Sequence, residues 1–281
     1  MSKSKDYDGT YKYLFSNKRI FYQLIKSFVK EDFITDISLD DITLVDRSFV
    51  SDEFLSRESD IIYKVNLKDV STSLRSVSRL KWSTEAYIYI LLEFQSTVDK
   101  TIPIRMALYT FQFYDLLFRN SQKGLLPSVF PILLYTGPDN WTIPSNIRDL
   151  IDKRIPEKYI PSFEYYKIIE KDIPDEVLLK LHNLISAIIY LEKRKDEKSL
   201  RNAIEKVIEL IKNENIIDIR MFTIWFKRMF RQKVDIEEYN KITNITEVNN
   251  MLTAIADEIM EKGVKKGVKK GKLEEKLEVA K

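Results

Sequence analysis

The pattern of apolar and polar residues predicts a central strand over residues 85–96, Glu-Ala-Tyr-Ile-Tyr-Ile-Leu-Leu-Glu-Phe-Gln-Ser. Strand side chains alternate, so one face of this strand is expected to carry Tyr87, Tyr89, Leu91, Glu93 and Gln95. Glu93 and Gln95 therefore point the same way at the end of an apolar strand. Burying an unpaired carboxylate is costly, so Glu93 is expected to meet a metal ion or a basic side chain, or to lie at an exposed strand end.

Three other segments predict strands, at residues 37–50, 58–65 and 129–135. Asp60 stands near the start of the second, and the polar residues 66–84 predict a long connection that returns the chain to the strand of Glu93. Residues 104–120 have helical periodicity and follow Pro103, a favoured residue in the first turn of a helix. A strand, a helix and a strand at this spacing predict a βαβ unit with parallel strands.

Two helices are expected in the first half of the chain. Residues 8–28 have an apolar period of about 3.6 residues, with Asp8 at the N-cap position. In the helix at 104–120, an apolar stripe consists of Ala107, Phe111, Tyr114 and Phe118. A second stripe, unlike a solvated charged face, consists of Arg105, Tyr109 and Gln112.

The second half of the chain has mostly helical patterning. Apolar residues at helical spacing occur in segments 147–151, 176–191, 199–211, 219–230 and 248–260. Near the end, Gly263, Gly267 and Gly271 recur in a basic repeat that is a poor helix former on its own. We therefore expect an α/β domain at residues 1–145, a helical accessory region at 146–260 that assembles protomers, and a basic glycine-repeat tail at 261–281.

Composition narrows the chemistry. The 281 residues include no cysteine and a single histidine, His182, so disulfides, thiolate sites and most zinc chemistry are excluded and any metal must be held by oxygen. The net charge of +3 neither supports nor excludes a nucleic-acid partner. The apolar runs are too short to cross a bilayer and the N-terminal residues lack a signal-peptide pattern, so we expect a cytoplasmic protein with no membrane partner.

Asp60 and Glu93 fall on strands expected to be neighbours, where two carboxylates can converge on one cation. Oxygen ligands suit Mg²⁺, and Mn²⁺ as a second choice, which favours metal-assisted phosphodiester hydrolysis. Gln95 could then hydrogen-bond the attacking water or the phosphate. A hydrolase of glycosidic bonds also uses two carboxylates, but it needs a large cleft with aromatic platforms, which no segment of this chain marks.

These residues also resemble a known group of proteins. Asp60, Glu93 and Gln95 resemble the D-Xn-E-X-K core of the PD-(D/E)XK nuclease superfamily, with glutamine at the usual lysine position. A closer resemblance is to the Rpn family of recombination-promoting nucleases and putative transposases, also called YhgA-like. The segments that carry it are residues 8–15, 58–60, 92–96, 103–109 and 131–137. The glycine repeat of the tail is similar to repeats that end many of those proteins.

The resemblance implies a Mg²⁺-dependent DNA endonuclease with an αβββαβ core and a mixed sheet, followed by an α-helical region. It further implies a homo-oligomer, most simply a dimer. Carried over to this chain, Asp60 and Glu93 become catalytic metal ligands and Gln95 a catalytic substitute for lysine. The substrate-binding candidates are Arg105, Asp8 and Tyr109.

The chain departs from that family in two places. Tyr7 precedes Asp8 where a histidine is common, and Gln95 cannot supply a cation. The alternative function is therefore a catalytically decayed nucleic-acid-binding or oligomeric adaptor protein, although intact Asp60 and Glu93 argue against decay.

Overall fold

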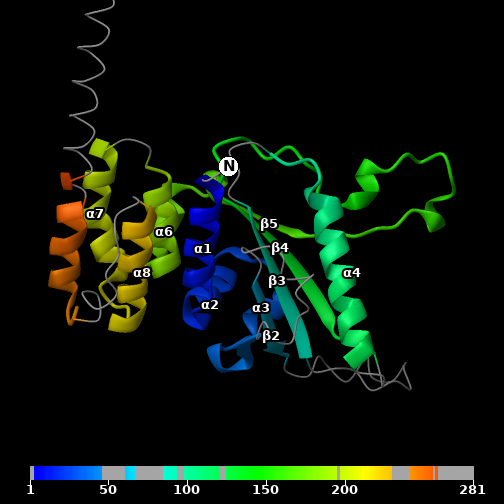
Figure 1. Ribbon diagram of the computed structural model, residues 1–281, viewed down its shortest axis with the longest axis horizontal. Helices are drawn as coiled ribbons and strands as arrows, with labels where there is room; N and C mark the ends of the chain where they lie inside the picture. Colours follow the sequence, from blue (N-terminus) through cyan, green and yellow to red (C-terminus); the bar gives the residue numbers. More distant parts are fainter. Residues whose placement is uncertain are drawn as a thin grey trace, which may run out of the picture. The chain divides into compact units, whose positions relative to one another are not determined.

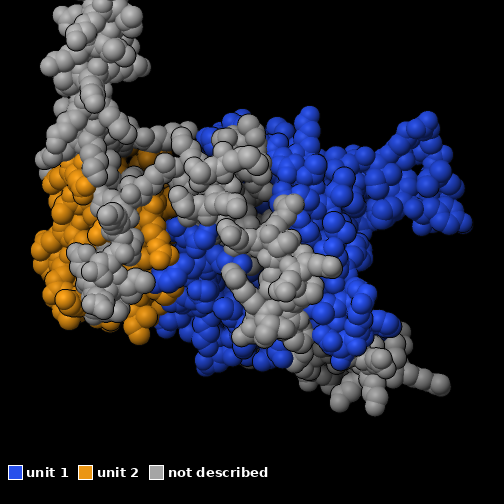
Figure 2. Space-filling view, viewed as in Figure 1, with its two compact units in different colours: residues 1–172 blue, residues 173–281 orange. Residues whose placement is uncertain are grey.

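The computed structural model describes residues 3–45, 61–67, 85–93, 98–120, 125–194, 197–229, 241–255 and 257–258. The chain forms two compact units, residues 1–172 and residues 173–281 (Figure 2). The sequence-based boundary at 145/146 differs from this division because residues after 145 return to the sheet.

The first unit is built on a five-stranded mixed sheet (Figure 1). Its strands, in spatial as well as chain order, are β1 Ile42–Leu44, β2 Ile61–Asn66, β3 Glu85–Glu93, β4 Ser128–Tyr135 and β5 Tyr166–Ile169. The pairs β1–β2 and β2–β3 are antiparallel, and the pairs β3–β4 and β4–β5 are parallel. The expected α/β class, mixed sheet and parallel βαβ unit are confirmed.

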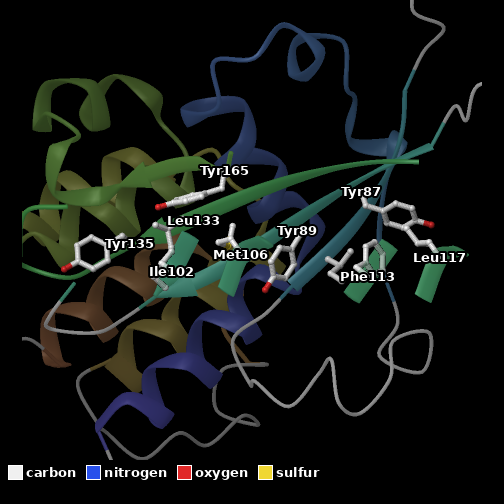
Figure 3. Close-up of a cluster of buried hydrophobic side chains, with 10 residues drawn as sticks. Tyr87, Tyr89, Ile102, Met106, Phe113, Leu117, Leu133, Tyr135 and Tyr165 are labelled. Carbon is white, nitrogen blue, oxygen red and sulfur yellow. The ribbon is translucent and has the colours of Figure 1, made fainter. Parts of the chain in front are cut away.

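Helix α4, Ile102–Asn120, makes the crossover between β3 and β4 and covers one face of the sheet (Figure 1). The buried cluster between α4 and the sheet comprises Ile62, Tyr87, Tyr89, Ile102, Met106, Phe113, Leu117, Leu133, Tyr135 and Tyr165 (Figure 3). Tyr87 and Tyr89 thus share a face, as strand alternation predicts.

Only part of the apolar stripe predicted for α4 faces the core. Phe111 and Phe118 are 58% and 62% exposed, whereas Met106, Phe113 and Leu117 are buried. This helix is apolar on two faces, so periodicity alone does not say which one meets the sheet.

The opposite face of the sheet meets α1 Lys3–Phe15 and α2 Lys18–Phe28, with the short helix α3 Asp32–Thr35 following. Tyr63 of β2 stacks on Phe21 with ring centroids 3.8 Å apart, and its hydroxyl donates a hydrogen bond to the Phe15 carbonyl at 2.7 Å. One side chain therefore ties β2 to both helices.

Two details differ from the single helix expected at 8–28. The helix breaks at Asn17, whose side chain accepts a hydrogen bond from the backbone N–H of Arg19 and so caps α2. Asp8 lies inside α1, which begins at Lys3, so it is not an N-cap residue.

After β4 the chain makes an excursion through two 3₁₀ turns, η4 Ile147–Leu150 and η5 Glu157–Tyr159, before it enters β5. The helix expected at 147–151 is thus only a short 3₁₀ turn. Strand β5 was not predicted, because four residues give too short a pattern to separate from a loop. The Tyr166 hydroxyl fastens β5 to the end of α2 by donating to the Phe28 carbonyl at 2.9 Å.

The second unit is helical, as expected. Its helices are α5 Asp175–Leu181, α6 Leu184–Glu192, α7 Glu197–Ile211 and α8 Ile216–Met229, and residues 245–255 are also helical. Trp225 and Phe226 of α8 are buried core residues. Within the part of the chain that is described, no helix is both long and apolar enough to span a bilayer.

Candidate functional site

Strand register brings the ends of three strands to one edge of the sheet. β2 runs antiparallel to β3, so the start of β2 lies at the same edge as the end of β3, and Ile61 pairs with Ile90. β4 runs parallel to β3, and its last residue, Tyr135, pairs with Glu93. The ends of β3 and β4 and the beginning of β2 therefore meet at this edge, which we call the candidate edge.

The three expected catalytic residues belong to this part of the sequence. Glu93 is the last residue of β3, and the structure describes its backbone but not its side chain. Asp60 and Gln95 lie outside the described residues. In the sequence, Asp60 immediately precedes Ile61, the first residue of β2. The catalytic and metal-binding roles of all three stay predictions.

The N-terminus of α4 follows the end of β3 and carries an ordered ion pair. Arg105 Nη1 donates to Asp99 Oδ2 at 2.8 Å, and the Arg105 side chain is only 15% exposed. The backbone N–H and the hydroxyl of Thr101 both donate to Asp99 Oδ1, at 2.8 and 2.7 Å. Partial burial acts to raise the pKa of Asp99, but the hydrogen bonds from Thr101 and Arg105 outweigh it and hold that pKa below its usual range.

This ion pair bears on the expected substrate role of Arg105. The guanidinium is held in one orientation by Asp99, so a phosphate could use only its remaining N–H groups or would have to displace the carboxylate. Tyr109 lies one turn farther along α4 and packs, partly buried, against the cluster below that helix. Contact of either residue with substrate stays a prediction.

Asp8 is carried by a different part of the unit. It lies in α1, whose last residue Phe15 accepts the hydrogen bond from Tyr63 on the other side of the sheet from α4. The elements that carry Asp8 and Arg105 thus cover opposite faces (Figure 1). The described structure does not bring these two helices together into one substrate site.

Three aromatic residues, Tyr135, Trp141 and Tyr165, pack next to the candidate edge. The sequence did not predict this packing. Tyr135 is fully buried and contacts the Trp141 ring, with centroids 4.9 Å apart, while Trp141 Nε1 donates to the Ile143 carbonyl at 3.0 Å. The Tyr165 hydroxyl donates to the Pro144 carbonyl at 3.1 Å, and burial raises the pKa of Tyr165 to about 12. The excursion after β4 is thereby held against the sheet, and apolar surroundings of this kind strengthen electrostatic interactions nearby.

The donor types at the candidate edge fit a hard cation. Two carboxylates and an amide oxygen are ligands that Mg²⁺ accepts, and neither imidazole nor thiolate is needed. Among side chains within the described ranges, no three His, Asp or Glu residues converge on a point that could hold a metal. The expected metal site therefore depends on Asp60 and Glu93.

Comparison with known proteins identifies the family. The model of the family described as "Putative transposase, YhgA-like" matches residues 5–220, well over half of the chain. The chain belongs to the YhgA-like family. No curated protein and no solved structure matches it.

The family match confirms the resemblance to the YhgA-like family, whereas the resemblance to the PD-(D/E)XK superfamily stays a prediction. The YhgA-like region includes the whole sheet with its covering helices, and it continues through α5, α6 and α7 into α8. The helices of the second unit up to residue 220 are thus part of the YhgA-like pattern. Residues 221–281, including the glycine repeat, lie beyond the match.

Proposed function

We propose that this YhgA-like protein is a Mg²⁺-dependent endonuclease that hydrolyses phosphodiester bonds of DNA, in recombination or against mobile or foreign DNA. The observation that supports it best is the strand register. Because β2 begins at the edge where β3 ends, Glu93 and Ile61, the residue that follows Asp60 in the sequence, belong to neighbouring strands that meet at this edge. Two carboxylates from adjacent strands are what a hard cation needs beside a phosphate.

In this proposal each residue of the edge has one task. Asp60 and Glu93 hold the cation, for which Mn²⁺ is an alternative to Mg²⁺. The bound ion supplies Lewis-acid stabilisation of the phosphoryl oxygen and a lowered pKa for a coordinated water. Gln95 orients the attacking water or a phosphate oxygen through its amide. The ion pair of Arg105 with Asp99 lies at the start of α4, where the helix dipole favours an anion.

The test is cleavage of supercoiled plasmid by the purified full chain, with Mg²⁺ or with a chelator. We expect nicked or linear product with Mg²⁺ and none with the chelator. Glu93→Gln keeps the shape of the side chain but removes its charge, and it should abolish cleavage. Glu157→Gln is the matched control, because the Glu157 side chain is 74% exposed on η5, outside the candidate edge, and its loss should leave the rate unchanged.

Two results would refute the proposal. One is cleavage by Glu93→Gln at the rate of the unmodified protein, which would trace the activity to a contaminant or to another site. The other is plasmid that stays intact with either Mg²⁺ or Mn²⁺ although the protein is folded.

A further inference from the structure

Helix α4 carries a row of large apolar side chains on its outer surface, away from the sheet. Ile104, Leu108, Phe111 and Phe118 are 53%, 50%, 58% and 62% exposed. The inner surface of the same helix already contributes Met106, Phe113 and Leu117 to the core. A contiguous exposed apolar row on a folded unit marks an interaction surface rather than ordinary scatter. We call Ile104, Leu108, Phe111, Asp115 and Phe118 the outer stripe.

The spacing of the outer stripe is that of a helix-pairing seam. Its members follow one another at intervals of four, three, four and three residues. This alternation is the heptad pattern that keeps one face of a helix against a neighbouring helix. The only charged member is Asp115, which pairs with Arg119 at 2.8 Å on the same helix.

The stripe is also close to symmetric about Phe111. Ile104 and Phe118 each stand seven residues from Phe111, and Leu108 and Asp115 stand three and four residues from it. A two-fold interface requires that residue i contacts j while j contacts i. Two antiparallel copies of α4 centred on Phe111 come close to this requirement, with Ile104 opposite Phe118 and Leu108 within one residue of the position opposite Asp115 of the other copy.

We propose that the outer stripe of α4 binds α4 of a second copy of this chain in antiparallel orientation. The area supports this partner. An exposed Phe presents on the order of 150–250 Å², so the half-exposed side chains of the stripe offer roughly 400 Å² per copy. A standard interface takes about 800 Å² from each partner, of which about 57% is apolar. The stripe therefore supplies nearly all the apolar area that such a dimer needs.

The charges permit the same pairing. Asp115 lies four residues from the centre, about 6 Å along the helix axis, so the two Asp115 carboxylates would be about 12 Å apart. This exceeds the Debye length of about 8 Å at physiological ionic strength. The other two charged residues of α4 do not belong to the stripe: Arg105 pairs with Asp99, and Arg119 pairs with Asp115 of the same helix. No like charges are therefore forced together at the centre of the pair.

The experiment measures the mass of the full chain in solution by sedimentation velocity, without DNA or metal. We expect a dimer. Leu108→Glu places a second carboxylate beside Asp115 of the partner and should raise the dimer dissociation constant at least about 30-fold, as for loss of a hot-spot contact. Leu108→Lys places an ammonium at the same position and should keep the dimer. Ile217→Glu on α8, where Ile217 is 64% exposed, is the matched control and should change nothing.

A double substitution tests the register. In Leu108→Glu with Asp115→Lys, each new glutamate faces a new lysine of the other copy, so the dimer should return. Within one chain the two positions are seven residues apart, about 10.5 Å along the axis, so an intrachain pair cannot explain the rescue.

A monomeric unmodified chain at about 100 μM would overturn the proposal, and so would a Leu108→Glu protein that stays dimeric. Failure of the double substitution to restore the dimer would overturn the antiparallel pairing. Circular dichroism of each variant verifies that it is folded. Because the readout is mass, absence of nuclease activity leaves this inference untouched.

Discussion

Glu93 and Tyr135, the last residues of β3 and β4, are register partners in the parallel part of the sheet. Tyr135 is fully buried against the cluster under α4. The strand that carries the expected metal ligand thus ends beside a strand whose end is fixed by aromatic packing. Rigid support of this kind is what a metal-ligating carboxylate requires, since a displacement of 1 Å is enough to impair catalysis.

If Asp60 and Glu93 are metal ligands, Asp60→Ala and Glu93→Ala should each abolish Mg²⁺-dependent cleavage and leave the melting temperature nearly unchanged. In the metal-free protein, the loss of one carboxylate removes its repulsion with the other carboxylate. It does not remove a side chain from the hydrophobic core, so the fold should remain stable. Plasmid cleavage and thermal melts of the two variants provide the measurement. Were Glu93 one half of a buried ion pair, its loss would cost about 3–5 kcal/mol of stability, and a variant that melts far lower yet still cuts DNA would contradict the assignment.

Substitutions of Gln95 should have graded effects. Gln95→Ala is expected to slow cleavage by about 10²-fold, the usual consequence of losing one positioning hydrogen bond in a transition state. Gln95→Lys introduces the lysine of the D-Xn-E-X-K pattern that Asp60, Glu93 and Gln95 resemble, and it should retain activity. Single-turnover rates at saturating Mg²⁺ measure both. Equal rates for the alanine variant and the unmodified protein would remove Gln95 from the mechanism.

Tyr63→Phe removes the hydrogen bond to the Phe15 carbonyl and keeps the stacking on Phe21. Since the carbonyl is left with a buried, unpaired lone pair, we expect a loss of about 1–3 kcal/mol in the free energy of unfolding. Urea denaturation provides the value. Tyr159→Phe is the control, because Tyr159 is 66% exposed and should tolerate the change. A Tyr63→Phe protein as stable as the control would show that the hydrogen bond contributes nothing net.

Glu192, at the end of α6, predicts a pH-dependent stability in the second unit. Burial raises its pKa well above the usual range, and its Oε2 atom is buried with no hydrogen-bond partner among the described residues. The folded state therefore binds the proton more tightly than the unfolded state, so stability is greatest below the unfolded pKa of about 4.3 and falls as pH rises through the folded value.

Glu192→Gln should consequently be more stable than the unmodified protein at neutral pH, and this difference should shrink as pH falls towards 4. Thermal melts from pH 4 to pH 8 provide the comparison. Glu176→Gln, on the exposed side of α5, should follow the unmodified protein at every pH. A stability difference for Glu192→Gln that does not vary with pH would contradict the burial of a charged carboxylate.

Local sequence was sufficient for the central βαβ unit. β3, α4 and β4 have continuous apolar or periodic patterns, and Pro103 and the break after Asn120 delimit the helix, so their types and order follow from short-range preferences. The helical pattern of segment 219–230, which contains the buried Trp225 and Phe226, follows from the same preferences. The chemical hypothesis for Asp60, Glu93 and Gln95 also comes from the sequence, through residue type, strand alternation and the resemblance to the YhgA-like family.

Tertiary structure decided what local pattern leaves open. Phe111 and Phe113 are equally apolar, and only the seating of α4 on the sheet buries one and exposes the other. β5 is a strand because β4 offers it an edge, and its four residues have no independent strand signal. Asp99 and Arg105 are six residues apart, outside the i,i+3 and i,i+4 spacing of helical ion pairs, so their pairing depends on how the loop enters α4. Periodicity records which faces are apolar, whereas the partner of each face is set by long-range packing.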